Sequence, residues 1–153
     1  MEAVRLVLST RSRYGLRAMF DLALNYGTGP VALKTVAERQ KLPEQYLEQI
    51  VIGLRRARLL RGVRGAQGGY ILTRPPEKIT VGDIIRALET AIAPANCVGD
   101  DSGSGCELAD FCPSRAVWAK IGESINNAMD GITLADMIDD YKGMCPSVTL
   151  SSD

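Results

Sequence analysis

The chain contains no histidine among its 153 residues. Histidine often serves as a general base at neutral pH and as a zinc ligand, so its absence excludes imidazole-based catalytic triads, metal ligands and pH switches. The sequence also offers no nucleophile–base pair and no nucleotide-binding glycine motif. We therefore expect a protein that is not an enzyme, and we disfavour a small redox or metal enzyme built on the cysteines.

Long hydrophobic runs are absent as well, because no stretch approaches the roughly 18 apolar residues of a membrane-spanning helix. The apolar patch at 3–8 is interrupted by Arg5 and is too short for the core of a signal peptide. We expect no membrane contact and a cytoplasmic location. Thiols stay reduced there, so the four cysteines are available for metal or redox chemistry.

Acidic side chains are missing from the middle of the chain, where no Asp or Glu occurs between Gly53 and Pro76. The formal net charge is zero, but residues 1–96 carry 15 Lys and Arg against 8 Asp and Glu. Residues 97–153 carry 3 against 10. A basic first part followed by an acidic second part indicates a polyanion-binding module attached to something else.

The segment 41–72 has the parts of a DNA-reading unit. A turn at Leu42-Pro43 precedes an amphipathic helix, and an arginine-rich stretch then leads into a tight glycine-rich hairpin at 64–70. Apolar residues recur in the helix at the spacing of one buried stripe, namely Leu47, Ile50, Val51 and Leu54. A helix for the major groove followed by a basic β-ribbon is typical of a winged helix-turn-helix domain.

The rest of the pattern completes a mainly α fold with a small β-wing. Further helices are expected at 13–26, 34–40, 81–89, 113–129 and 134–141, a short edge strand at 31–33, and wing strands at 60–64 and 70–73. Thr80 with Asp83 and Thr133 with Asp136 resemble capping boxes. We divide the chain into a winged helix-turn-helix domain at 8–90, a cysteine-bearing loop at 91–112, a dimerisation helix and short capping helix at 113–141, and a tail at 142–153.

Double-stranded DNA is the expected partner of the first domain. Arg and Lys side chains suit phosphates, Gln and Glu suit base edges in the major groove, and an arginine at the wing tip suits a narrow minor groove. The predicted contacts are Arg13, Lys34, Glu44, Gln45, Tyr46, Glu48, Gln49, Arg55, Arg56, Arg64 and Gln67. The alternative is a winged helix that binds protein.

Cys97, Cys106 and Cys112 follow the spacing C-x8-C-x5-C in an acidic, glycine-rich stretch. Three thiolates on one loop favour a soft metal or an iron–sulfur cluster. The alternatives are a structural zinc site, a thiol redox switch and cysteines without a role. Cys145 stands apart from the other three, either without a role or as a fourth ligand.

The helix at 113–129 admits two interpretations. It packs against its own domain, or it packs against its twin in a second subunit. We favour a homodimer, since a dimer reads two DNA half-sites and a single winged helix reads too few base pairs for useful specificity.

Several short motifs together resemble one family, the bacterial iron–sulfur winged-helix regulators typified by IscR and NsrR, with CymR as a cluster-free relative. The resemblance spans 8–141. Its carriers are Arg13-Tyr14-Gly15-Leu16 with Ala18-Met19, Tyr46-Leu47-Glu48-Gln49, Val63-Arg64-Gly65, Gly68-Gly69-Tyr70, Val81-Gly82-Asp83-Ile84 and the cysteine loop followed by Trp118.

The resemblance implies a homodimeric transcription regulator, a repressor, whose operator affinity depends on a [2Fe-2S] or [4Fe-4S] cluster. In similar proteins the residues matching Glu48, Gln49 and Arg64 contact DNA, and the cysteines matching Cys97, Cys106 and Cys112 hold the cluster. The likeness to CymR implies the alternative, a cluster-free regulator that responds to thiol oxidation or to a partner.

Two departures from the family pattern affect the cluster. IscR-like proteins place a histidine three residues after the last cysteine, where this chain has Arg115, and NsrR-like proteins borrow an aspartate from the partner at a position that corresponds to Arg13. Arginine stays protonated and offers no lone pair to a metal. The fourth ligand is left open among Asp100, Asp101, Glu107, Asp110, Cys145, a partner carboxylate and a bound small molecule.

Overall fold

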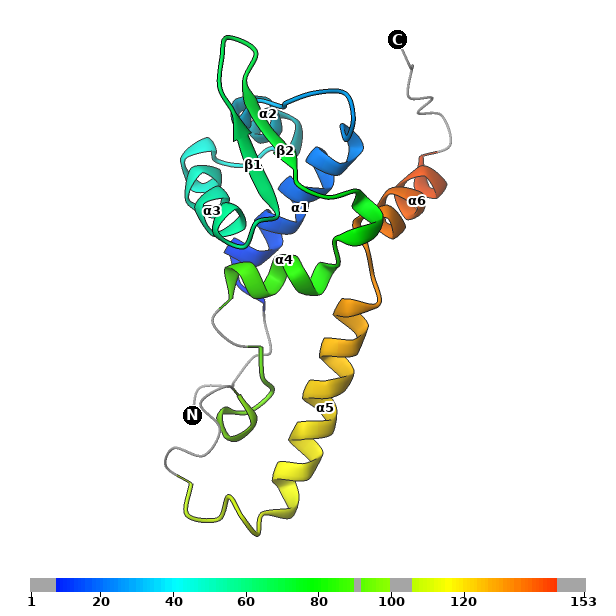
Figure 1. Ribbon diagram of the computed structural model, residues 1–153. Helices are drawn as coiled ribbons and strands as arrows, with labels where there is room; N and C mark the ends of the chain where they lie inside the picture. Colours follow the sequence, from blue (N-terminus) through cyan, green and yellow to red (C-terminus); the bar gives the residue numbers. More distant parts are fainter. Residues whose placement is uncertain (1–7, 90–91, 100–105, 146–153) are drawn as a thin grey trace.

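The computed structural model describes residues 8–89, 92–99 and 106–145. Its elements, in chain order, are α1 (Thr10–Leu24), α2 (Leu33–Gln40), α3 (Glu44–Arg56), β1 (Leu60–Val63), β2 (Gly69–Leu72), the 3-10 turn η1 (Pro76–Lys78), α4 (Val81–Leu88), the 3-10 turn η2 (Asn96–Val98), α5 (Pro113–Asp130) and α6 (Leu134–Met144) (Figure 1). A mainly helical chain with one small antiparallel sheet confirms the predicted fold class.

Helices α1, α4 and α6 begin where a side chain accepts a hydrogen bond from a free amide of the first turn. Thr80 and Thr133 form the two capping boxes that the sequence predicted, each with the aspartate three residues later. The start of α1 differs from the prediction, because Ser9 caps this helix by accepting a hydrogen bond from the amide of Ser12 at 3.1 Å. The cap adds one turn before Arg13.

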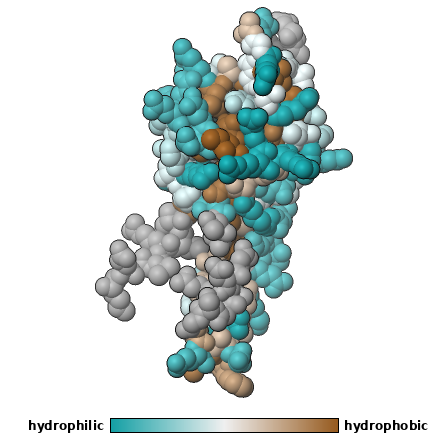
Figure 2. All heavy atoms as spheres, turned by 60° about the vertical axis from the view of Figure 1, so that its left-hand side comes forward, coloured by the Kyte–Doolittle hydropathy of each residue, from teal (hydrophilic) through white to brown (hydrophobic). Residues whose placement is uncertain are grey.

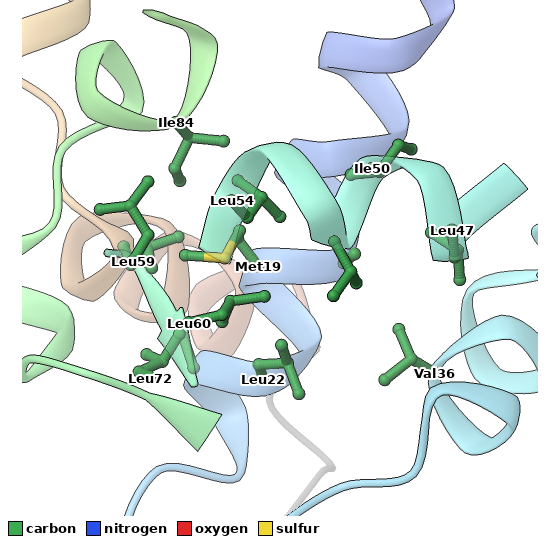
Figure 3. Packing of buried hydrophobic residues seen from close by; sticks show 14 of the residues in the cluster. Met19, Leu22, Val36, Leu47, Ile50, Leu54, Leu59, Leu60, Leu72 and Ile84 are labelled. Carbon is green, nitrogen blue, oxygen red and sulfur yellow. The ribbon is translucent and has the colours of Figure 1, made fainter. Parts of the chain in front are cut away.

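A left-handed residue makes the turn between α2 and α3. Lys41 adopts φ 53° and ψ 51°, and the amide of Leu42 donates to the carbonyl of Ala37 at 2.9 Å. Pro43 then caps α3. The predicted stripe of α3 is buried, and Figure 3 shows its leucines gathered with Met19 and Val36 in one core.

The wing is the hairpin of β1 and β2, registered from Leu60 opposite Leu72 to Val63 opposite Gly69. Leu60 and Leu72 are buried and anchor its base to the core. The predicted edge strand at 31–33 shrinks to one residue, because Val31 pairs with Tyr70 and Leu33 already begins α2.

The last helix folds back onto the winged domain. Leu134 of α6 is fully buried in the main core, and the rings of Phe20 and Tyr141 meet edge to face at 5.3 Å. The helix continues to Met144, so the tail predicted from residue 142 begins later than expected. Residues 146–153 of that tail lie outside the described residues.

Helix α5 extends away from this domain (Figure 1), and only Gly122 and Met129 of its 18 residues are buried. Its last turn is held against α4 by the Arg86–Asp130 ion pair at 2.7 Å. The molecule therefore consists of a compact head and one long arm, α5, with the described residues 106–112 at the far end of the arm.

Candidate nucleic-acid interface and cysteine segment

All eleven predicted DNA-contacting side chains are exposed. On the first turns of α3, Gln45, Tyr46 and Gln49 line an open cavity of about 590 Å³ together with Thr10 and Tyr14 of α1. The rings of Tyr14 and Tyr46 pack edge to face, with centroids 5.6 Å apart and planes at 86°. This contact fixes the start of α3 against α1. Thr10 and Tyr14 are not among the DNA contacts predicted from the sequence.

A run of cations follows the exposed face of α3 onto the wing. Arg55 and Arg56 end the helix, Arg58 turns the chain in the left-handed region with φ 58°, and Arg64 reaches the wing tip. Within the described residues, no carboxylate pairs with any arginine from 55 to 64. Hydrophilic side chains surround a small apolar patch on the face that carries α3 (Figure 2). The charges are thus free to meet phosphates.

A buried carboxylate holds the helix-turn-helix together. Asp21 of α1 is 2% exposed and accepts hydrogen bonds from Arg39 at 2.7 Å and Gln40 at 3.1 Å, both at the end of α2. Arg17 also donates to the backbone carbonyl of Gln40. A buried charge is tolerated only when it is paired and hydrogen-bonded, so this cluster fixes α2 on α1 and positions the turn that starts α3.

A second polar cluster joins the start of α1 to the end of α4. One oxygen of Glu89 accepts from the amide of Ser9 at 3.0 Å, from the hydroxyl of Ser9 at 2.5 Å and from the hydroxyl of Ser12 at 2.7 Å. Burial would raise the pKa of Glu89, but these hydrogen bonds and the charge of Arg11 outweigh it and lower the pKa. The chain enters the cysteine segment from this fixed point.

The three predicted cluster ligands lie in different surroundings. Cys97 belongs to η2 and Cys112 caps α5, and both are half-buried, whereas Cys106 is exposed. Cys112 lines an open cavity of about 490 Å³ with Val98, Arg115, Ala116 and Ala119. Cys145 follows α6, beyond the other end of α5 (Figure 1).

Thiolates are suitable ligands for a soft metal or an iron–sulfur cluster. Among the residues that the structure describes, however, no three Cys, Asp or Glu side chains converge on one point. Glu107 and Asp110 are exposed, and Asp100 and Asp101 lie outside the described residues. The described chain therefore brings two cysteines to the start of α5 without closing a ligand set.

Comparison with known proteins identifies the family. A family model described as Rrf2, iron-dependent transcriptional regulator, matches residues 8–140. The chain belongs to the Rrf2 family. This Rrf2 chain is 41% identical over 130 residues to the HTH-type transcriptional regulator CymR of Bacillus subtilis (strain 168), with 85% of the chain and 88% of CymR covered. It is 36% identical over 135 residues to IscR of Klebsiella pneumoniae (strain 342), with 88% and 81% covered.

Solved structures agree with this assignment. The IscR of T. potens superimposes with a TM-score of 0.75 at 49% identity, covering 94% of this chain and 93% of that one. The CymR (YrzC) of B. subtilis gives a TM-score of 0.72 at 41% identity, covering 87% and 96%. The predicted resemblance is confirmed, and relatives named as transcriptional regulators also bear out the prediction that the Rrf2 chain is not an enzyme.

The arm of the Rrf2 chain carries three apolar side chains that are exposed among the described residues. Val117 is 53% exposed, and Trp118 and Ile121 are each 39% exposed on neighbouring turns of α5.

None of the helices in the described ranges is both long and apolar enough to cross a lipid bilayer.

Proposed function

We propose that this Rrf2-family chain is a homodimeric repressor that binds operator DNA in the cytoplasm, with an affinity set by the state of its cysteine segment. The observation that carries the proposal is the cationic surface that runs from α3 to the tip of the wing. Its arginines face solvent without carboxylate partners among the described residues, and a polyanion is the natural partner for such a surface.

In this proposal α3 enters the major groove and the wing lies against a neighbouring groove. Gln45, Glu48 and Gln49 read base edges, while Arg55 and Arg56 contact phosphates. Of the remaining predicted contacts, Glu44 and Tyr46 lie on the first turn of α3. The others flank them: Arg13 on α1, Lys34 on α2, and Arg64 and Gln67 on the hairpin. The buried Asp21 cluster supports this arrangement, because it fixes the angle at which α3 leaves the turn.

The cysteine segment is the proposed sensor. An iron–sulfur cluster would be held by Cys97, Cys106 and Cys112. Such a cluster supplies a centre that responds to redox state. The 49% identity to an IscR and the family description support this assignment. Arg115 cannot be the fourth ligand, because a guanidinium has no lone pair to donate.

A cluster-free regulator of the CymR type is the second candidate. Two observations favour it: the exposed thiol of Cys106, and the lack of three converging ligands in the described part of the chain. The 41% identity to CymR supports it equally. In this case oxidation of the thiols, or a partner, would change DNA affinity.

Two joints of the described chain connect the sensor to the DNA-binding head. Glu89 ties the entry of the cysteine segment to the first turn of α1, and the Arg86–Asp130 pair ties the end of α5 to α4. A change in the segment would alter how two heads in a dimer face the DNA, to the extent that the signal favours one arrangement over the other.

Anaerobic purification followed by operator binding tests the proposal. We expect visible absorption, stoichiometric iron and sulfide, and different operator affinities for the loaded and stripped protein. Cys106→Ala should lose iron and bind DNA like the stripped protein, while the control variant Lys142→Ala, at an exposed position of α6 outside the candidate ligands, should keep both properties. The affinity should also fall steeply with salt, with a slope of roughly −0.9 per phosphate contact.

The outcomes separate the candidates. A colourless, iron-free protein whose DNA affinity follows thiol oxidation supports the CymR type. Equal affinity of Cys106→Ala and wild type under all of these conditions contradicts control by the cysteines, and duplex binding that does not respond to salt contradicts DNA recognition itself.

A further inference from the structure

Arg115 connects the two described parts of the cysteine segment, residues 92–99 and residues 106–112. Its Nε donates to the backbone carbonyl of Cys97 at 3.1 Å, and its Nη1 donates to the backbone carbonyl of Ala109 at 3.1 Å. These acceptors lie 18 and 6 residues away along the chain. One side chain thus connects residues 92–99 with residues 106–112, which are separated along the chain by residues 100–105.

The geometry suits arginine in particular. A guanidinium presents its donors in a rigid planar fork, whereas a lysine ammonium is a point charge that cannot reproduce two divergent bonds of this kind. Hydrogen bonds from a charged donor are also stronger than those between neutral groups. Arg115 is half-buried, so both bonds are partly shielded from water.

Helix formation does not explain the presence of this cation. Arg115 lies in the first turn of α5, where the positive end of the helix dipole disfavours a positive charge. The same turn contains no acidic residue to compensate. In the described chain, the contacts of the guanidinium are backbone carbonyls of the cysteine segment.

We propose that Arg115 is a positioning residue. It holds the turn η2, which contains Cys97, against the start of α5, where Cys112 lies, so that the two thiols act as a pair. This inference rests on the proposed function only in taking the cysteines to act together. Arg115 itself binds no metal. Its task is to preassemble two of the three thiols before any ligand or oxidant arrives, beside the cavity that Val98, Cys112 and Ala119 line.

The test uses full-length, metal-free, reduced protein in which Cys106→Ser and Cys145→Ser leave only two thiols. Phenylarsine oxide bridges a close pair of thiols by forming two As–S bonds and releasing water, and intact mass then shows one arsenical per chain. The readout is the concentration of 2,3-dimercaptopropanol that removes half of it. We expect Arg115→Met to lower this concentration about tenfold, because the hydrogen bonds from the charged guanidinium to the carbonyls of Cys97 and Ala109 are lost.

Two variants keep the test decisive. Arg115→Lys preserves the charge but not the fork, so it should resemble Arg115→Met. Lys120→Met removes an exposed cation from the same helix and should match the parent protein. Thermal unfolding followed by circular dichroism identifies any variant that has lost its fold. If Arg115→Met is unfolded, Arg115→Lys is compared with the parent protein in its place.

The proposal is overturned if Arg115→Met retains the arsenical as well as the parent protein does. It is also overturned if Arg115→Lys behaves like the parent, which would mean that charge alone suffices, or if mass spectrometry shows only bridges between two chains. Operator binding of wild type with and without the arsenical is measured in parallel. If affinity does not respond, control by the cysteines fails, while the effect of Arg115 on thiol pairing is still decided by the first assay.

Discussion

At the tip of the wing, Arg64 precedes a glycine whose φ of 125° suits few other residues. Arg64 is exposed, so its guanidinium is able to enter a groove of the DNA. We predict that Arg64→Ala weakens operator binding by about 1–3 kcal/mol and relaxes the preference for A·T pairs at the edge of each half-site. Fluorescence anisotropy with operators changed at that edge measures both effects. Lys142→Ala, on α6, is the control, and an unchanged affinity and footprint would rule out this role.

Glu89 gives a prediction about pH. Its pKa is lowered in the folded state, so its contribution to stability is present above its ordinary pKa of 4.5 and is lost as the pH falls through the lower folded value. Urea unfolding should therefore show wild type more stable than Glu89→Gln at pH 7. The difference should shrink below about pH 4.5. A difference that stays constant down to pH 3 would contradict the hydrogen-bonded carboxylate.

At the residue scale, only local features could be predicted from the sequence. The capping threonines were recognised because their partners lie three residues away. The Ser9–Glu89 bond joins residues 80 positions apart, and the Arg115–Cys97 bond joins residues 18 positions apart. No spacing rule connects such residues, because their proximity depends on the path of the whole chain.

At the scale of elements, the wing depends on close approach of two backbones. A Cβ added to Gly69 would collide with the backbone carbonyl of Val31, which pairs with Tyr70 beside it. A Cβ added to Gly62 would lie 3.7 Å from the ring of Tyr70, an ordinary contact. The two glycines therefore form a matched pair on one hairpin.

We predict that Gly69→Ala destabilises the protein by about 1–3 kcal/mol, as overpacking typically does. Gly62→Ala should change stability much less. Thermal unfolding measures the difference, and DNA binding should weaken only for Gly69→Ala, because a displaced hairpin carries Arg64 with it. Equal unfolding midpoints for the two variants would show that Val31 does not constrain the wing.

The elements themselves were largely predictable. The apolar spacing in α3 and the turn at Leu42-Pro43 gave the recognition helix, and the structure buries the predicted stripe. The short strand at 31–33 was predicted too long, since the start of α2 competes for Leu33. Helix α6 was predicted too short, because it runs through Gly143, a weak helix former, to Met144.

For the whole molecule, the exposed apolar face of α5 leads to a prediction about assembly. We expect Ile121→Glu to convert a dimer into monomers, because a carboxylate buried between two arms would be desolvated without a partner. Asn127→Glu, on another face of the same helix, should leave the dimer intact. Sedimentation velocity distinguishes the two. If Ile121→Glu stays dimeric, α5 does not form the subunit interface through this face.

Local sequence patterns are enough to specify the helices, the hairpin, the division into a basic and an acidic part, and the set of soft thiol donors. These follow from periodicity, caps and composition, which act over a few residues or over simple sums of charge. The path of the folded chain, in contrast, is what returns α6 to the head, brings Glu89 to the start of α1 and lets Arg115 connect two parts of the cysteine segment. Those contacts join distant positions, and they form because burial of the shared core fixes where each helix ends in space.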